Sequence, residues 1–79
     1  MTDPTINLRK VLIQTFQNSK IPKEIKGLKM GDFDEWDSFG NFNLILAIEN
    51  EYKIQFDMEE LEKLTSVASL QKAIEHALS

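Results

Sequence analysis

The stretch from Ser38 to Tyr52 restricts the fold of this chain more than any other part of the sequence. Its apolar residues recur at the spacing of an α-helix and lie around much of the circumference of that helix. Such a helix is usually buried by its neighbours. A chain of 79 residues forms one domain with a small core, so we expect a single domain over residues 1–79 with this helix at its centre. The apolar residues are Phe39, Phe42, Ile45, Leu46 and Ile48.

The N-terminal part of the chain predicts another helix. Asp3 followed by Pro4 is typical of a helix start, with Asp as the N-cap and Pro in the first helical position. A broad apolar stripe follows, and we expect the helix to end near Asn18 and Ser19. The stripe contains Ile6, Leu8, Val11, Leu12, Ile13 and Phe16.

Two more helices are predicted after a brief extended link at residues 53–56. Asp57 and Glu60 have the spacing of a capping box in front of residues 58–64, which carry one short apolar stripe. Either Thr65 or Ser66 is expected to cap the last helix. The buried side of that helix should carry Val67, Leu70, Ile74 and Leu78.

Residues 20–37 follow neither a helical nor a strand period, yet apolar residues recur in them. A structureless loop of this length is unusual in a compact domain, so we expect it to be ordered against the helices, with a short helical turn near Lys23 to Lys26. The predicted fold class is therefore all-α: four helices, the third short, with a long ordered loop between the first two. The loop anchors are Ile21, Ile25, Leu28, Met30, Phe33 and Trp36.

The composition argues against several classes of protein. The chain has no cysteine and one histidine, which argues against a disulfide framework and a thiolate zinc cluster. The longest apolar run, Leu44 to Ile48, is far shorter than the roughly 20 residues of a membrane-spanning helix, and the N-terminus lacks the pattern of a signal peptide. A net charge of −4 disfavours nucleic acid and favours basic protein surfaces as partners. We expect a soluble, cytoplasmic monomer.

Acidic residues before the central helix could suggest calcium binding. The EF-hand loop needs an oxygen ligand at its fifth position, glycine at its sixth and glutamate at its twelfth. Counting from Asp32, those positions hold Trp36, Asp37 and Asn43. No metal site is therefore predicted.

Ser38 is the most distinctive polar residue at the start of the central helix. Either Ser38 or Asp37 could be the N-cap, and capping by Asp37 would leave the serine hydroxyl free. A catalytic serine needs a base within hydrogen-bond reach, whereas His76, the sole histidine, lies near the end of the last helix. The chain is therefore not expected to be an enzyme. An exposed hydroxyl without its own base suits a serine that another protein modifies.

The loop is basic at its start and acidic at its end. Lys20, Lys23, Lys26 and Lys29 precede the acids that lead to Ser38. Charge runs of this kind are usually solvated surfaces. The functional alternative is a docking signal in which the acidic end meets a basic partner.

At this point the sequence resembles the acyl carrier protein family. The family motif Asp-Ser-(Leu, Met or Phe) is present as Asp37-Ser38-Phe39 at the start of a helix, and that helix ends in Ala47-Ile48-Glu49-Asn50-Glu51-Tyr52, as in the family. The link Ile54-Gln55-Phe56, the acidic segment 57–64 and Thr65-Ser66-Val67 follow in register. The resemblance is clearest over residues 34–78, and it implies a four-helix bundle of acyl-carrier type.

The resemblance also implies a function. A magnesium-dependent phosphopantetheinyl transferase would let the Ser38 hydroxyl attack the pyrophosphate of coenzyme A, leaving 4′-phosphopantetheine on the serine through a phosphodiester. The arm ends in a thiol, which would carry acyl or aminoacyl groups as thioesters from a loading enzyme to an acceptor transferase. Asp37 would belong to the motif that the first transferase recognises.

Partner enzymes of the family dock beside the attachment serine, mainly on the helix that follows it. Fatty-acid carriers typically place acids where this chain has Gly40 and Asn43, so docking should depend more on aromatic residues and on the acids before the helix. We expect a specialised pathway with a short or polar cargo; the alternative is an unmodified helical module that only binds a protein. The expected partner-binding residues are Asp34, Glu35, Trp36, Phe39, Phe42, Asn43 and Glu49.

Overall fold

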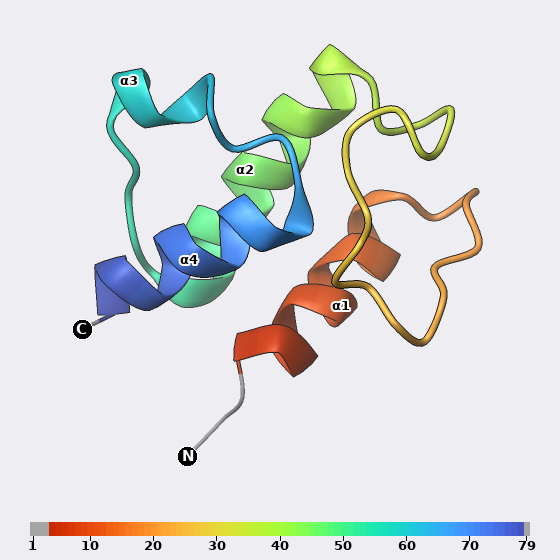
Figure 1. Cartoon of the computed structure of the whole chain (residues 1–79), viewed down its shortest axis with the longest axis horizontal. Coiled ribbons are helices and arrows are strands. Elements are labelled where there is room, and N and C mark those ends of the chain that lie inside the picture. Colours follow the sequence, from red (N-terminus) through yellow and green to blue (C-terminus); the bar gives the residue numbers. More distant parts are fainter. Residues whose placement is uncertain (1–3, 79) are drawn as a thin grey trace.

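The chain folds into four helices, with no β-strand among residues 4–78, which are the residues that the computed structural model describes. They are α1 (Pro4–Thr15), α2 (Ser38–Tyr52), α3 (Met58–Leu61) and α4 (Val67–Leu78), as Figure 1 shows. The predicted all-α fold with a short third helix is confirmed. Side chains are described from Leu8 to Leu78.

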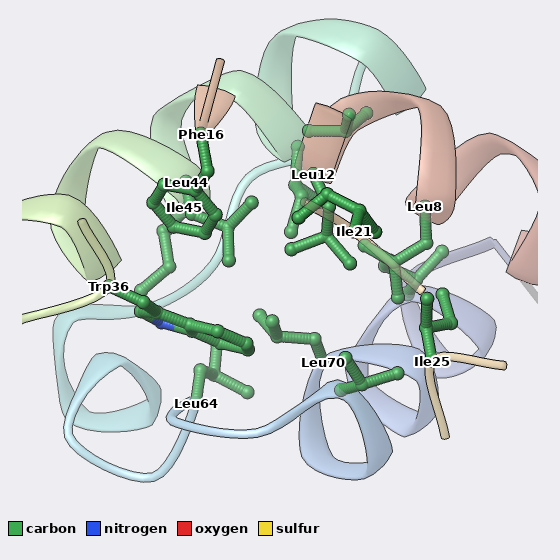
Figure 2. Close-up of a cluster of buried hydrophobic side chains, with 14 of the residues drawn as sticks. Leu8, Leu12, Phe16, Ile21, Ile25, Trp36, Leu44, Ile45, Leu64 and Leu70 are labelled. Atoms are coloured by element: carbon green, nitrogen blue, oxygen red, sulfur yellow. The ribbon is translucent and has the colours of Figure 1, made fainter. Parts of the chain in front are cut away.

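One hydrophobic cluster joins the helices. α1 packs against both α2 and α4, and each of these three helices contributes fully buried aliphatic side chains. Figure 2 shows Leu8, Leu12, Leu44 and Leu70 in this cluster. The opposite side of α2 is open, because Phe39, Phe42 and Leu46 are exposed. The expectation that this helix lies at the centre of the domain is therefore correct for one side of the helix only.

α1 is shorter at its end than the sequence predicted. It ends at Thr15, where the N–H of Phe16 donates to the carbonyl of Leu12 at 2.9 Å. Phe16 is buried with Leu8 and Leu12 on the same face, with 1% of its surface exposed. The chain then forms a turn, in which the N–H of Ser19 donates to the carbonyl of Phe16 at 3.0 Å, so the helix does not continue to Asn18. The predicted cap Asp3 lies outside the described residues.

The loop at residues 16–37 is ordered against the helices, as predicted. Ile21, Ile25 and Trp36 are buried, while Leu28, Met30 and Phe33 pack against the core. Between residues 20 and 37 the described chain contains turns and bends but no helix, so the helical turn expected near residues 23–26 is absent.

Hydrogen bonds join the middle of this loop to α1 and to the start of α4. On the α1 side, Arg9 donates through Nε to the carbonyl of Pro22 at 3.1 Å and through Nη2 to that of Ile21 at 3.4 Å. On the α4 side, Lys29 and Ser66 form an isolated antiparallel bridge. In that bridge the N–H of Met30 donates to the carbonyl of Thr65 at 2.7 Å, and the N–H of Val67 to that of Leu28 at 2.9 Å.

α3 has four residues, fewer than predicted. The helix is followed by a turn at residues 62–63, and Leu64 is buried beyond that turn. The predicted capping box is wrong, because the side chain of Asp57 accepts no hydrogen bond at the helix start. The capping box in this region belongs to α4: Ser69 N–H donates to Ser66 Oγ at 3.2 Å, and Ser66 N–H donates to Ser69 Oγ at 3.1 Å.

Candidate functional site

Asp37, and not Ser38, caps α2. The Asp37 backbone is extended, and its Oδ1 accepts the N–H of Gly40 at 2.8 Å. Ser38 is the first helical residue and is exposed, and its hydroxyl forms no hydrogen bond with any described residue. Of the two alternatives that the sequence left open, the structure shows the one that leaves the serine free.

A buried network of hydrogen bonds holds the first turn of α2 against the core. Asn41 is the only polar or charged residue among the described side chains that is buried. Its Oδ1 accepts the indole N–H of Trp36 at 2.8 Å, and its Nδ2 donates to the carbonyl of Leu64 at 2.9 Å. Asn41 thereby joins the loop, α2 and the segment before α4, and both ends of its amide are satisfied, as burial requires.

The loop backbone touches the first turn of α2 at Gly40. A Cβ atom at this position would collide with the carbonyl oxygen of Glu35 and lie 3.3 Å from a ring atom of Phe16. The Glu35 side chain is also held, because its Oε1 accepts the hydroxyl of Ser19 at 2.7 Å. Glycine is therefore required for close approach here, whatever it costs the helix.

Aromatic side chains stabilise the same part of the loop. The Trp36 ring lies 5.6 Å from that of Phe16 and 6.4 Å from that of Phe33, centroid to centroid. Trp36 is completely buried, and Figure 2 shows it below Leu44 and Ile45. Its predicted role in partner contact is therefore wrong for this conformation, because no part of its surface reaches solvent; the ring orders the loop instead.

A surface groove begins at Ser38 and follows α2 toward α3. Its volume is about 360 Å³, and aliphatic and aromatic side chains form much of its wall. Two carboxylates, Glu49 and Glu62, also line it. The lining residues are Ser38, Asn41, Phe42, Ile45, Leu46, Glu49, Gln55, Phe56, Leu61 and Glu62.

The other residues predicted to bind partners differ in exposure. Phe39 is 75% exposed and Phe42 49%, and Asp34 and Asn43 are also exposed. Glu35 and Glu49 are half-buried. Glu49 has a structural role, because its Oε2 accepts the N–H of Phe56 at 2.8 Å and so holds the link after α2. The structure thus brings Phe39, Phe42 and Asn43 onto the exposed part of one helix.

The Ser38 hydroxyl forms no hydrogen bond with His76 or with any other described side chain. His76 lines a different groove, between α4 and the α3 region, and Ser38 does not contribute to that groove. Within the described residues no group of three or more His, Asp or Glu side chains could hold a metal ion. Over the same residues, no helix has the length and apolarity needed to cross a membrane.

Sequence reasoning missed the two residues that support the site. From the sequence, Gly40 is noted only as a position where fatty-acid carriers typically have an acid, and no role is predicted for Asn41. An asparagine among the apolar residues of a helix expected to be buried was the available signal, because a buried amide needs partners. The partners themselves come from Trp36 and Leu64 and could not be read from spacing.

Comparison with protein-family models, with curated proteins and with solved structures finds no match for this chain. The resemblance carried by Asp37-Ser38-Phe39 therefore remains a prediction.

Proposed function

We propose that this chain is a carrier protein that receives a 4′-phosphopantetheine arm on Ser38 from coenzyme A, through a separate phosphopantetheinyl transferase. The Ser38 oxygen would form the new phosphodiester and lose its proton, while the pyrophosphate bond of coenzyme A breaks and adenosine 3′,5′-bisphosphate leaves. The observation that carries the proposal is the exposed Ser38 hydroxyl, which Asp37 leaves free by capping α2 itself. Neither the fold nor the helix cap uses this oxygen, so its modification breaks no described hydrogen bond.

The residues around Ser38 fit a phosphodiester. The first N–H groups of an α-helix point out of its N-terminus, and the positive end of the helix dipole favours a negative charge there. Asp37 occupies the N–H of Gly40, and its carboxylate would disfavour a free anion. A phosphate on Ser38 would be kept in place by its covalent bond.

The arm would supply a thiol, which a chain without cysteine lacks. The protein's own residues would hold the attachment point rigid. Asp37 fixes the first turn, Gly40 lets the loop close against it, and Asn41 ties both to the core through Trp36 and Leu64. A rigid attachment point lets a flexible arm reach different enzymes from one defined origin.

The groove beside Ser38 supports a short or polar cargo. It is about 360 Å³ in volume, and Phe42 and Leu46 line it near the exposed face of α2. The carboxylates of Glu49 and Glu62 line it as well, and carboxylates are poor neighbours for a long alkyl chain. We propose acyl or aminoacyl thioesters of a specialised pathway as the cargo, in a cytoplasmic, monomeric protein.

Loading and acceptor enzymes would dock on the exposed part of α2 and on the acids before it. Phe39 offers the largest exposed aromatic surface on this helix, and Phe42 and Asn43 lie within the next turn. Asp34 and Asp37 add negative charge beside them, which favours partners with basic surfaces.

Intact-mass measurement after incubation with coenzyme A, Mg²⁺ and a broad-specificity transferase tests the proposal. We expect the mass to rise by one phosphopantetheine in the wild-type chain and not in Ser38→Ala. Ser19→Ala is the matched control: Ser19 lies in the loop and bonds to Glu35, and its variant should be modified like the wild type.

An unchanged mass with several transferases would contradict the proposal. It would favour the alternative, a helical module that binds a protein through the same exposed aromatic face without being modified.

A further inference from the structure

The charges of this chain are separated along the sequence. Residues 4–31 contain six of the nine basic residues and a single acid, Glu24, whereas residues 32–78 contain three lysines and eleven acids. In Figure 1 the first of these segments is α1 and the loop beside it, and α3 lies on the other side of the view. The molecule thus has a basic region although its net charge is −4.

The basic region contains a groove of about 510 Å³ between α1 and the loop. Arg9 and Lys10 line it from α1, and Lys23 lines it from the loop. Its apolar surface comes from two isoleucines: Ile13, which is 43% exposed, and Ile25, which is buried. Gln14 and Glu24 complete the lining.

Hydrogen bonds from Arg9 join α1 to the loop beside the groove. Arg9 donates to the carbonyls of Ile21 and Pro22, and these bonds use only some of its five N–H groups. Lys10 and Lys23 are exposed, and neither forms an ion pair or hydrogen bond with a described residue. Three cations therefore surround an apolar surface, opposed by the one carboxylate of Glu24.

We propose that this groove is a docking site for an acidic segment of a partner protein, in which an apolar side chain lies between carboxylates. The apolar side chain would cover Ile13, and the carboxylates would meet Arg9, Lys10 and Lys23. The surface is distinct from the exposed face of α2, so the inference holds whether or not Ser38 is modified.

Charge and shape favour a protein segment over an extended polyanion. A DNA duplex or an anionic membrane presents negative charge over a wide area and would repel the eleven acids of residues 32–78. None of those eleven acids lines the groove, so a short segment that binds within it contacts only the carboxylate of Glu24. The exposed surface of Ile13 also needs an apolar partner, which a phosphate backbone does not offer.

Titration of the full chain with a short blocked peptide, a leucine flanked on both sides by glutamates, tests the proposal by amide NMR. We expect saturable shifts that centre on residues 9–14 and 23–25 and that decrease as salt is added, because exposed charges are screened. The double variant Lys10→Gln, Lys23→Gln should raise the Kd roughly fivefold or more. Ile13→Ser should weaken binding as well.

Two controls keep the test specific. Lys63→Gln removes a lysine from another surface and should leave the Kd unchanged, and a peptide with glutamine in place of glutamate should not bind. The proposal is overturned if the glutamate peptide gives no saturable shift, or if Lys63→Gln weakens binding as much as the double variant. It is equally overturned if phosphatidylglycerol vesicles bind these residues more tightly than the peptide does. A further contrary outcome is that the acidic α3 region of a second copy of the chain occupies the groove, which would appear as amide shifts that depend on protein concentration in the absence of peptide.

Discussion

Asp37 and Ser38 are adjacent in the chain, but their side chains have opposite surroundings. The Asp37 carboxylate is committed to the N–H of Gly40, while the Ser38 hydroxyl points to solvent without a partner among the described residues. Because the aspartate satisfies the helix start, the serine is available for chemistry that does not disturb the fold.

Substitutions at these two positions should separate capping from modification. Asp37→Ala removes the cap and should lower the free energy of unfolding by about 1 kcal/mol. Ser38→Ala removes a hydroxyl without contacts and should change it by less than about 0.5 kcal/mol. Asp37→Asn keeps a capping oxygen and should stay close to wild type. Urea unfolding measures all three; equal destabilisation by Ser38→Ala and Asp37→Ala would contradict the assignment of the cap.

Asn41 is expected to contribute more to stability than any other polar side chain of α2. Asn41→Ala leaves the Trp36 indole N–H and the Leu64 carbonyl buried without their partner and should cost about 2–4 kcal/mol. Asn43→Ala, an exposed asparagine on the same helix, is the matched control and should cost less than about 0.5 kcal/mol. If urea unfolding gives similar losses in the free energy of unfolding for both variants, the buried hydrogen bonds of Asn41 do not stabilise the fold as proposed.

At the scale of elements, the contact between α2 and the loop depends on Gly40. Gly40→Ala improves helix propensity by about 1 kcal/mol, but the new methyl group collides with the backbone of Glu35, which no side-chain rotation can relieve. We expect a net loss of about 1–3 kcal/mol. The control is Gly27→Ala in the same loop, where no atom lies within 4 Å of the new Cβ. If Gly40→Ala is as stable as Gly27→Ala in thermal unfolding, the close approach is not rigid.

The elements differ in how far the sequence could predict them. The bounds of α2 were predicted correctly because Asp37 is a strong local cap and the apolar period continues to Tyr52. α3 was predicted too long because Leu64 continues the helical period of Met58 and Leu61, although it reaches the core through a turn. The spacing of apolar residues shows which side chains are suited to the core. It does not show whether such a residue, here Leu64, is buried from a helix or from a turn.

The whole molecule has one core, and Trp36 is inside it. The loop, α1, α2 and α4 all contribute side chains to the same cluster. Trp36 is the sole tryptophan, so its fluorescence reports the loop, while far-UV circular dichroism reports the helices. We expect both signals to change at the same urea concentration, as in a two-state transition. An earlier transition in fluorescence would contradict a shared core.

The candidate site was predictable only in its local part. The motif Asp37-Ser38-Phe39 and the exposure of Ser38 follow from neighbouring residues in the sequence. The burial of Trp36 and the bond from Asn41 to Leu64 depend on segments that meet only in the folded chain, and local patterns carry no information about them.

The bridge between Lys29 and Ser66 affects when the chain can complete its fold during synthesis. It joins the loop to a segment that is synthesised much later, and Val67, Leu70 and Ile74 complete the core from the same late segment. While the ribosome still holds that segment, the first two helices have no α4 to cover them and the loop has no strand-like partner. The core is therefore complete only once α4 has left the ribosomal tunnel.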